Sequence, residues 1–163
     1  SDVCSSDLLC DPAAILADVV ELYEPLAEED GAKITVSAED GLTIHANREL
    51  IGQALANLLD NALKYGLTDQ VREIVAEVKR VGLMVEISIA DHGAGISVSD
   101  RARVTDRFVR LEGSRSRPGS GLGLSMAQAI LKLHGGDLRI EDNAPGLRVV
   151  LALPLITQQV KNV

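Results

Sequence analysis

The 163-residue sequence is poor in aromatic side chains, with two Tyr, one Phe and no Trp. Because 46% of it is nonetheless hydrophobic, we expect a core built from Leu, Val, Ile and Ala. Its two cysteines, Cys4 and Cys10, both lie in the first ten residues, which excludes a disulfide framework or a cysteine metal cluster. No apolar run approaches the roughly 18 residues that a membrane-spanning helix needs.

The sequence also lacks an excess of basic residues. Its 16 Lys and Arg stand against 24 Asp and Glu, for a formal net charge of −8. This balance predicts no nucleic-acid partner and no direct contact with an anionic membrane surface. At about 150 residues per domain, the length predicts one domain. We therefore expect a soluble, cytoplasmic domain.

The first eight residues, SDVCSSDL, have no helical or strand period and lack the basic and apolar regions of a signal peptide. They match, residue for residue, a translation of the end of a common short-read sequencing adapter. We therefore expect residues 1–10 to be a non-native or disordered segment, 11–156 to be the domain and 157–163 to be a frayed tail. An ordinary disordered N-terminus is the alternative. On the adapter interpretation, the natural protein is longer at its N-terminus.

Beyond this segment, apolar periodicity predicts helices that alternate with hairpins. The predicted order is a helix from 12 to about 30, a hairpin of strands 33–38 and 42–46, a helix from 48 to 65, a hairpin of strands 74–79 and 83–90, a helix from about 121 to 133, and a hairpin of strands 138–141 and 147–153. Residues 92–120 have no period and form a long loop, of a length typical of functional lids. This order predicts an α+β fold, a two-layer sandwich in which about three helices cover one face of a mixed sheet.

Four polar residues share one stripe of the second predicted helix: Asn57, Asn61, Lys64 and Tyr65. Two Asn four residues apart need a reason, because Asn is a middling helix former. Amide oxygens suit a hard cation such as Mg²⁺, a lysine can neutralise a phosphate, and a tyrosine ring can pack against a base. The alternative is a solvated helix edge.

Two glycine-containing segments flank the long loop. In DHGAGI, Asp91 follows a strand and can accept a hydrogen bond from an exocyclic amine such as that of adenine, while Gly93 and Gly95 let a ligand approach the backbone. In GSGLGL, glycines precede a helix N-terminus, which suits phosphates. Leu124 breaks the spacing of both the P-loop and the dinucleotide-binding motif. The alternatives are a strand-to-loop turn for the first segment and a flexible hinge for the second.

Taken together, four segments resemble the sequence boxes of bacterial sensor histidine kinases. Residues 57–65 (NLLDNALKY) resemble the N box, 91–96 (DHGAGI) the G1 box, 107–110 (RFVR) the F box and 119–124 (GSGLGL) the G2 box. They occur in the family's order and spacing, and the resemblance covers about residues 11–154. It implies the Bergerat ATP-binding fold, with a long ATP lid at about 92–120, which agrees with the predicted element order.

The resemblance implies roles for five residues of the first two boxes. Asn61 would coordinate Mg²⁺, and Asn57 would lie beside it near the phosphates or the water shell of the metal. Lys64 would meet the phosphates and Tyr65 would pack near the adenine. Asp91 would bind the adenine amine.

Further nucleotide contacts are implied for the loop and the helix after it: Gly93, Gly95, Ile96, Phe108, Gly119, Ser120, Gly121, Leu122, Gly123 and Leu124. The glycines would make room for the base or wrap the phosphates, Phe108 would anchor the lid, and Leu124 would pack at its base. The candidate lid cations are Arg110, Arg115 and Arg117, and the resemblance does not choose among them. Together with Asn57 and Lys64, they make up the expected catalytic set. The sequence departs from the family at two positions. His92 stands where Asn or Asp is common, and Asn47 stands where an acidic residue is usual.

Relatives of this fold that hydrolyse ATP carry a Glu where this chain has Asn57. An amide cannot accept a proton, so we expect MgATP binding with very slow turnover and transfer of the γ-phosphate to another nucleophile. The resemblance implies a histidine on a separate dimerisation and phosphoacceptor helical domain, with relay to an Asp of a response regulator receiver domain. None of His45, His92 and His134 has a phosphoacceptor-like context, so the chain is expected to lack the acceptor. The alternative is an inactive or regulatory nucleotide-binding module, whereas the long loop with Phe108 disfavours a serine-directed kinase.

Overall fold

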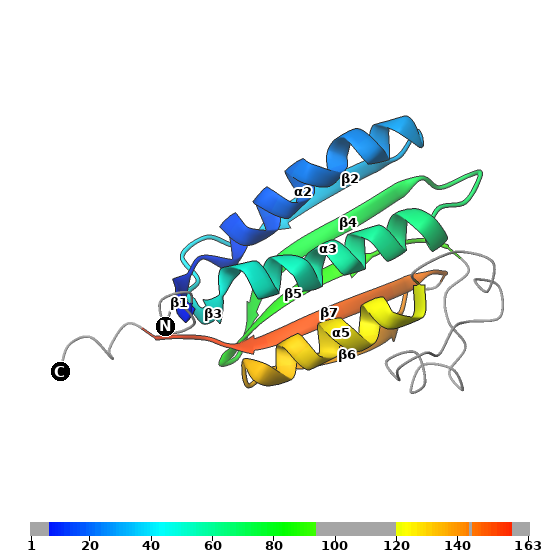
Figure 1. The fold of residues 1–163 in the computed structure, drawn as a ribbon. Helices are drawn as coiled ribbons and strands as arrows, with labels where there is room; N and C mark the ends of the chain where they lie inside the picture. The colour runs from blue at the N-terminus through cyan, green and yellow to red at the C-terminus, as the bar shows by residue number, and fades with distance from the viewer. Residues whose placement is uncertain (1–6, 94–119, 144, 158–163) are drawn as a thin grey trace.

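The structure of the chain, a computed structural model, describes residues 7–93, 120–143 and 145–157, and of Asp7 and residues 120–123 only the backbone. These residues form three helices and seven strands (Figure 1). The helices are α2 (Pro12–Glu29), α3 (Arg48–Tyr65) and α5 (Ser120–Leu133). The strands are β1 (Asp7–Cys10), β2 (Lys33–Ala38), β3 (Ile44–Asn47), β4 (Glu73–Val81), β5 (Met84–Ala90), β6 (Asp137–Asp142) and β7 (Leu147–Pro154).

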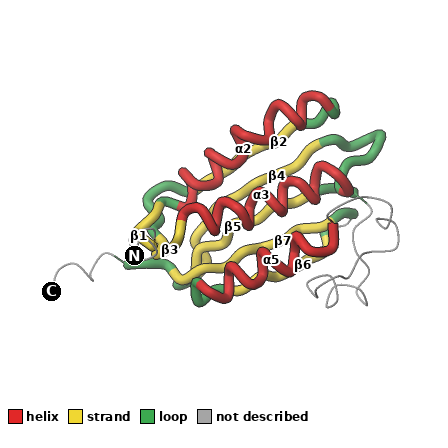
Figure 2. Tube along the Cα trace, in the orientation of Figure 1, coloured by secondary structure: helices red, strands yellow, loops and turns green. Residues whose placement is uncertain are grey.

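Five of these strands make one mixed sheet in the order β2-β4-β5-β7-β6, and the three helices lie side by side on one of its faces (Figure 2). Strand β2 runs parallel to β4, and the other neighbours are antiparallel. The predicted α+β sandwich, with one face of a mixed sheet covered by helices, is confirmed. Its core lies between the layers, where Ile51, Leu55 and Leu59 of α3 are fully buried.

Local sequence signals set the ends of the first two helices as predicted. The Asp11 carboxylate accepts a hydrogen bond from the Ala13 N–H at 2.9 Å, next to a proline in the first turn. Asn47 caps α3 in the same way, because its side-chain oxygen accepts from the Leu50 N–H at 3.1 Å. Gly66 ends α3.

The predicted hairpin of residues 33–38 and 42–46 is wrong. Strand β2 continues along β4 instead, where the Glu39 N–H still donates to the Val78 carbonyl at 2.9 Å. The chain then turns away through Gly41, whose φ of +82° favours glycine. Alternation shows which residues are half-buried, but it does not name the strand partner. Along the chain, β3 and α3 lie between β2 and β4, and this connection returns β4 parallel to β2.

Part of the segment predicted to be non-native or disordered, residues 1–10, has regular structure. Asp7–Cys10 forms β1, which pairs antiparallel with β3, from Asp7 opposite Asn47 to Cys10 opposite Ile44. This pairing is open to β1 because β3 does not pair with β2. The non-native origin of residues 1–8 stays a prediction, and residues 1–6 and the expected tail at 158–163 lie outside the described part of the chain.

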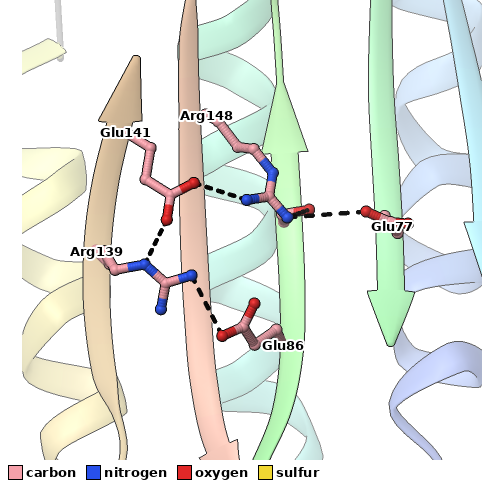
Figure 3. Close-up of polar contacts among 6 residues, drawn as sticks. Glu77, Glu86, Arg139, Glu141 and Arg148 are labelled. Atoms are coloured by element: carbon pink, nitrogen blue, oxygen red, sulfur yellow. Dashed lines mark hydrogen bonds and ion pairs between the residues drawn. The ribbon is translucent and has the colours of Figure 1, made fainter. Parts of the chain in front are cut away.

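On the face without helices, a chain of ion pairs joins β4, β5, β7 and β6 (Figure 3). Arg148 lies between Glu141, 2.7 Å away, and Glu77, 3.8 Å away. Arg139 pairs with Glu141 and, at 3.2 Å, with Glu86. Beneath this network Ser88 and Val150 are buried, at 3% and 0% exposed. The charged side chains therefore neutralise one another and shield the centre of the open face.

We expect Glu141→Gln to weaken the fold modestly at neutral pH. Hydrogen bonding to Arg139, and then to Arg148, holds the pKa of Glu141 below its ordinary 4.5. Because the pKa is lowered in the folded state, the ionised Glu141 stabilises the fold at a pH above 4.5. This stabilisation is lost as the pH falls through the folded-state pKa. Because the pairs are partly exposed, the free energy of unfolding at pH 7 should fall by only about 0.5–1 kcal/mol.

Urea unfolding of Glu141→Gln from pH 7 down to pH 3 measures this contribution. The variant and the wild type should converge in acid, and Glu21→Gln, at an exposed position of α2, should match the wild type throughout. A deficit that persists undiminished in acid would contradict the assignment.

Candidate functional site

The end of α3 and the end of β5 meet, which brings the first two predicted boxes together. A Cβ built on Gly93 would lie 2.7 Å from the Tyr65 carbonyl oxygen. A Cβ built on Gly66 would lie 2.5 Å from Cγ of Asp91. Both separations are shorter than real contacts of a Cβ, so glycine at these two positions lets the helix end sit directly against the strand end.

Asp91 is the buried carboxylate of this site, with 8% of the residue exposed. Its Oδ1 accepts from two backbone N–H groups, that of Gly93 at 3.0 Å and that of Leu147 at 3.1 Å. Among the described residues no hydrogen bond is recorded for Oδ2, which lies beside Gly66. The carboxylate is thus fixed through one oxygen and can accept from a ligand through the other.

Burial raises the pKa of Asp91 above its ordinary 3.8. The two backbone hydrogen bonds and the nearby His92 oppose that shift. The net direction is upward because desolvation penalises the charged form more than these contacts favour it. A donor that approaches Oδ2, such as an exocyclic amine, would stabilise the charged form further.

The polar residues of α3 occupy its last two and a half turns, next to α5. The Asn57 amide contacts Met126 of α5, with Nδ2 3.7 Å from the sulfur. Asn61 is half-buried one turn further on. Lys64 is exposed and its Nζ lies 2.9 Å from Oδ2 of Asp60, so its ammonium group is held on the helix by an i,i+4 ion pair.

Helix α5 begins at Ser120, so part of the predicted phosphate-wrapping segment is helical. Ser120, Gly121, Leu122 and Gly123 form its first turn, where backbone N–H groups have no partner within the helix. Leu124 is buried, at 7% exposed, and its place at the base of the lid stays a prediction. The other predicted positions lie outside the described residues: Gly95, Ile96, Phe108, Arg110, Arg115, Arg117 and Gly119.

Comparison with known proteins assigns the family. The family described as histidine kinase-, DNA gyrase B- and HSP90-like ATPase matches residues 46–157, more than half of the chain. The chain belongs to this family. Within it, the similar proteins are sensor kinases, and the chain is an ATP-binding catalytic domain of the histidine kinase type.

Two curated kinases of this family illustrate the likeness. The probable sensor protein PcoS of Escherichia coli is 34% identical over 148 residues, which are 90% of this chain and 30% of PcoS. The sensor histidine kinase CusS of Escherichia coli K12 is 33% identical over 138 residues, 83% of this chain and 28% of CusS. The chain thus spans less than a third of the length of these kinases.

Solved histidine kinase domains have the same fold. The mycobacterial sensor histidine kinase MprB superposes with a TM-score of 0.79 at 26% identity, over 93% of this chain and 99% of that one. The histidine kinase domain of the Escherichia coli osmosensor EnvZ gives 0.69 at 25% identity, over 93% and 90%.

Three contributors to this candidate site went unrecognised in the sequence. Gly66 was predicted only as the end of a helix, yet it packs against the Asp91 carboxylate. Leu147 and Asn143, in the last hairpin, donate to Oδ1 and to the backbone carbonyl of Asp91, respectively. The turn signal of the last hairpin was visible, but only the β5–β7 pairing shows that this turn meets Asp91.

Proposed function

We propose that the domain binds MgATP and donates the γ-phosphate to a histidine on a separate dimerisation and phosphoacceptor domain, for relay to an aspartate of a response regulator receiver domain. The observation that carries the proposal is the Asp91 carboxylate, buried and fixed through Oδ1 with Oδ2 able to accept from adenine. The exocyclic amine of adenine is a donor that matches this acceptor.

On α3, which the structure describes in full, the position expected beside the phosphates carries an amide in place of a base, and this favours phosphoryl transfer over hydrolysis. Asn57 cannot take a proton from water. Asp60, the nearest acidic residue along α3, is ion-paired with Lys64. Water is therefore activated poorly, and the bound nucleotide is held for another nucleophile.

His134 has a structural role, which fits a phosphoacceptor outside this domain. Both ring nitrogens of His134 are used within the fold: Nε2 accepts from the Asn47 N–H at 3.0 Å, and Nδ1 donates to the Ile130 carbonyl at 2.7 Å. The ring thereby ties the end of α5 to the start of α3. These contacts leave neither ring nitrogen of His134 available to accept a phosphoryl group.

Magnesium fits the donors that α3 offers. Mg²⁺ keeps several waters and binds through one or two protein oxygens together with the substrate phosphates. The described residues hold no group of three or more His, Cys, Asp or Glu that would form an all-protein metal cage. Asn61 would supply an amide oxygen, and the metal would neutralise charge on the phosphates.

We expect Asn61→Ala to remove the magnesium dependence of nucleotide binding. The wild-type affinity for ATP should rise by about tenfold or more on adding Mg²⁺, whereas the variant should show little gain, because a coordinating ligand is lost. Titration with and without EDTA measures this. A wild-type gain retained in Asn61→Ala would contradict the metal role.

No helix in the described part of the chain is long and apolar enough to cross a membrane. We place the domain in the cytoplasm, where ATP and a receiver domain are available.

Incubation with labelled ATP and a cognate helical phosphoacceptor domain tests the whole proposal. Histidine labelling together with slow hydrolysis supports it, whereas nucleotide binding without labelling would favour the inactive or regulatory module.

A further inference from the structure

The backbone of Asp91 departs from the regular ladder between β5 and β7. The paired register ends at Ala90 and Arg148, and the next opposed residues are Asp91 and Leu147. The Asp91 N–H donates to the Leu147 carbonyl at 2.9 Å. In a regular antiparallel pair, the Leu147 N–H would donate back to the Asp91 carbonyl. Here it donates to Oδ1 of the Asp91 side chain, at 3.1 Å.

Asn143 supplies the donor that the Asp91 carbonyl gives up. Its side-chain nitrogen lies 2.7 Å from that carbonyl oxygen. A carbonyl oxygen only accepts, so the amide NH₂ of Asn143 must face it. The contact spans 52 residues of sequence and joins the β6–β7 turn to the end of β5.

The turn around Asn143 is shaped for this contact. Its N–H donates to the Gly146 carbonyl at 3.1 Å, which closes the turn. Gly146 has a φ of +113°, and a Cβ there would lie 2.0 Å from the Asp91 carbonyl oxygen. Glycine is therefore required both for the backbone conformation and for the close approach of the two segments.

We propose that Asn143 is a positioning residue for adenine recognition. Its side chain donates to the Asp91 carbonyl, so the Leu147 N–H is left to hold the Asp91 carboxylate. This inference rests on the proposed nucleotide-binding function. Without the Asn143 amide, the Leu147 N–H is drawn back to the Asp91 carbonyl, and Oδ1 keeps only the Gly93 N–H. The carboxylate then loses its fixed orientation. Binding of the exocyclic amine is therefore weakened, whereas binding of the phosphates is not.

The test compares two nucleotides that differ at that amine. ADP carries the amine, and inosine diphosphate (IDP) carries a carbonyl oxygen in its place. Calorimetry would give both affinities for the wild type, Asn143→Ala and Asn143→Asp, the last of which is nearly isosteric with Asn but has no donor at neutral pH. In both variants the ADP affinity should fall about tenfold, as expected for one well-placed hydrogen bond, and the IDP affinity should stay within about twofold.

Glu141→Gln is the matched control, because it perturbs the same hairpin on the face without helices and should leave the ratio of ADP to IDP affinity unchanged. A ratio of ADP to IDP affinity that stays unchanged in both Asn143 variants would overturn this inference but not the proposed function. Equal losses of both nucleotides, in step with a lower melting temperature, would reduce Asn143 to a purely structural role and also overturn it. A wild type that binds neither nucleotide would overturn the proposed function as well.

Discussion

Asp91→Asn is expected to abolish specific nucleotide binding and leave the fold intact. The asparagine oxygen can still accept from the Gly93 and Leu147 N–H groups, so its NH₂ group takes the place of Oδ2. Two donors, this NH₂ and the adenine amine, would then face each other. The loss of a charge-assisted hydrogen bond together with this conflict should lower ATP affinity by about 100-fold or more.

The stability of the same variant should not fall at neutral pH. Burial raises the pKa of Asp91. A carboxyl group whose pKa is higher in the folded state stabilises the fold at a pH below its unfolded-state pKa, and this stabilisation is lost as the pH rises through its folded-state pKa. At pH 7 the wild type therefore bears the cost of a buried charge that the neutral amide avoids.

Thermal unfolding and nucleotide titration at pH 7 measure these two effects. We expect a melting temperature equal to or above that of the wild type, together with the loss of binding. Unfolding of Asp91→Asn at room temperature would show that the carboxylate is required structurally, and undiminished ATP affinity would remove Asp91 from the site.

Gly66→Ala is expected to damage both the fold and the site. The φ of Gly66 is −102°, which alanine adopts easily, so the backbone conformation is not the obstacle. The obstacle is Asp91, whose Cβ and Cγ would each lie 2.5 Å from the new methyl group. Either α3 or the carboxylate must move, at a cost of about 1–3 kcal/mol in unfolding free energy.

Gly52→Ala on the same helix is the control for Gly66→Ala. Its Cβ would lie 3.8 Å from a methyl group of Val19, an ordinary contact, so replacing a helical glycine should stabilise the domain by about 0.5–1 kcal/mol. Chemical unfolding with ADP titration of both variants checks this. We expect opposite changes in stability, with nucleotide binding lost only in Gly66→Ala. A Gly66→Ala variant that binds ADP normally would contradict the packing of the helix end against Asp91.

Much of the site is visible in the sequence because its residues act within short segments. Asn57, Asn61, Lys64 and Tyr65 fall on one helical stripe by spacing alone, and Asp91 follows a strand whose composition marks it. Gly66 and Asn143 were not assigned to the site, because each acts through a residue far away in the sequence. A helix-ending glycine or a turn asparagine has a local explanation, which hides its second role.

The sequence by itself determined the helices, their caps, most of the strands and the family, because caps, periodicity and box spacing are local properties of the chain. It also predicted two of the hairpins, β4 with β5 and β6 with β7, because a short turn joins the strands of each. Only the tertiary structure decided the other pairings. It placed β2 parallel to β4, joined β1 to β3, and brought the β6–β7 turn against Asp91. Partners that are not joined by a short turn are chosen by the burial of whole layers and by long-range backbone hydrogen bonds, which no local pattern encodes.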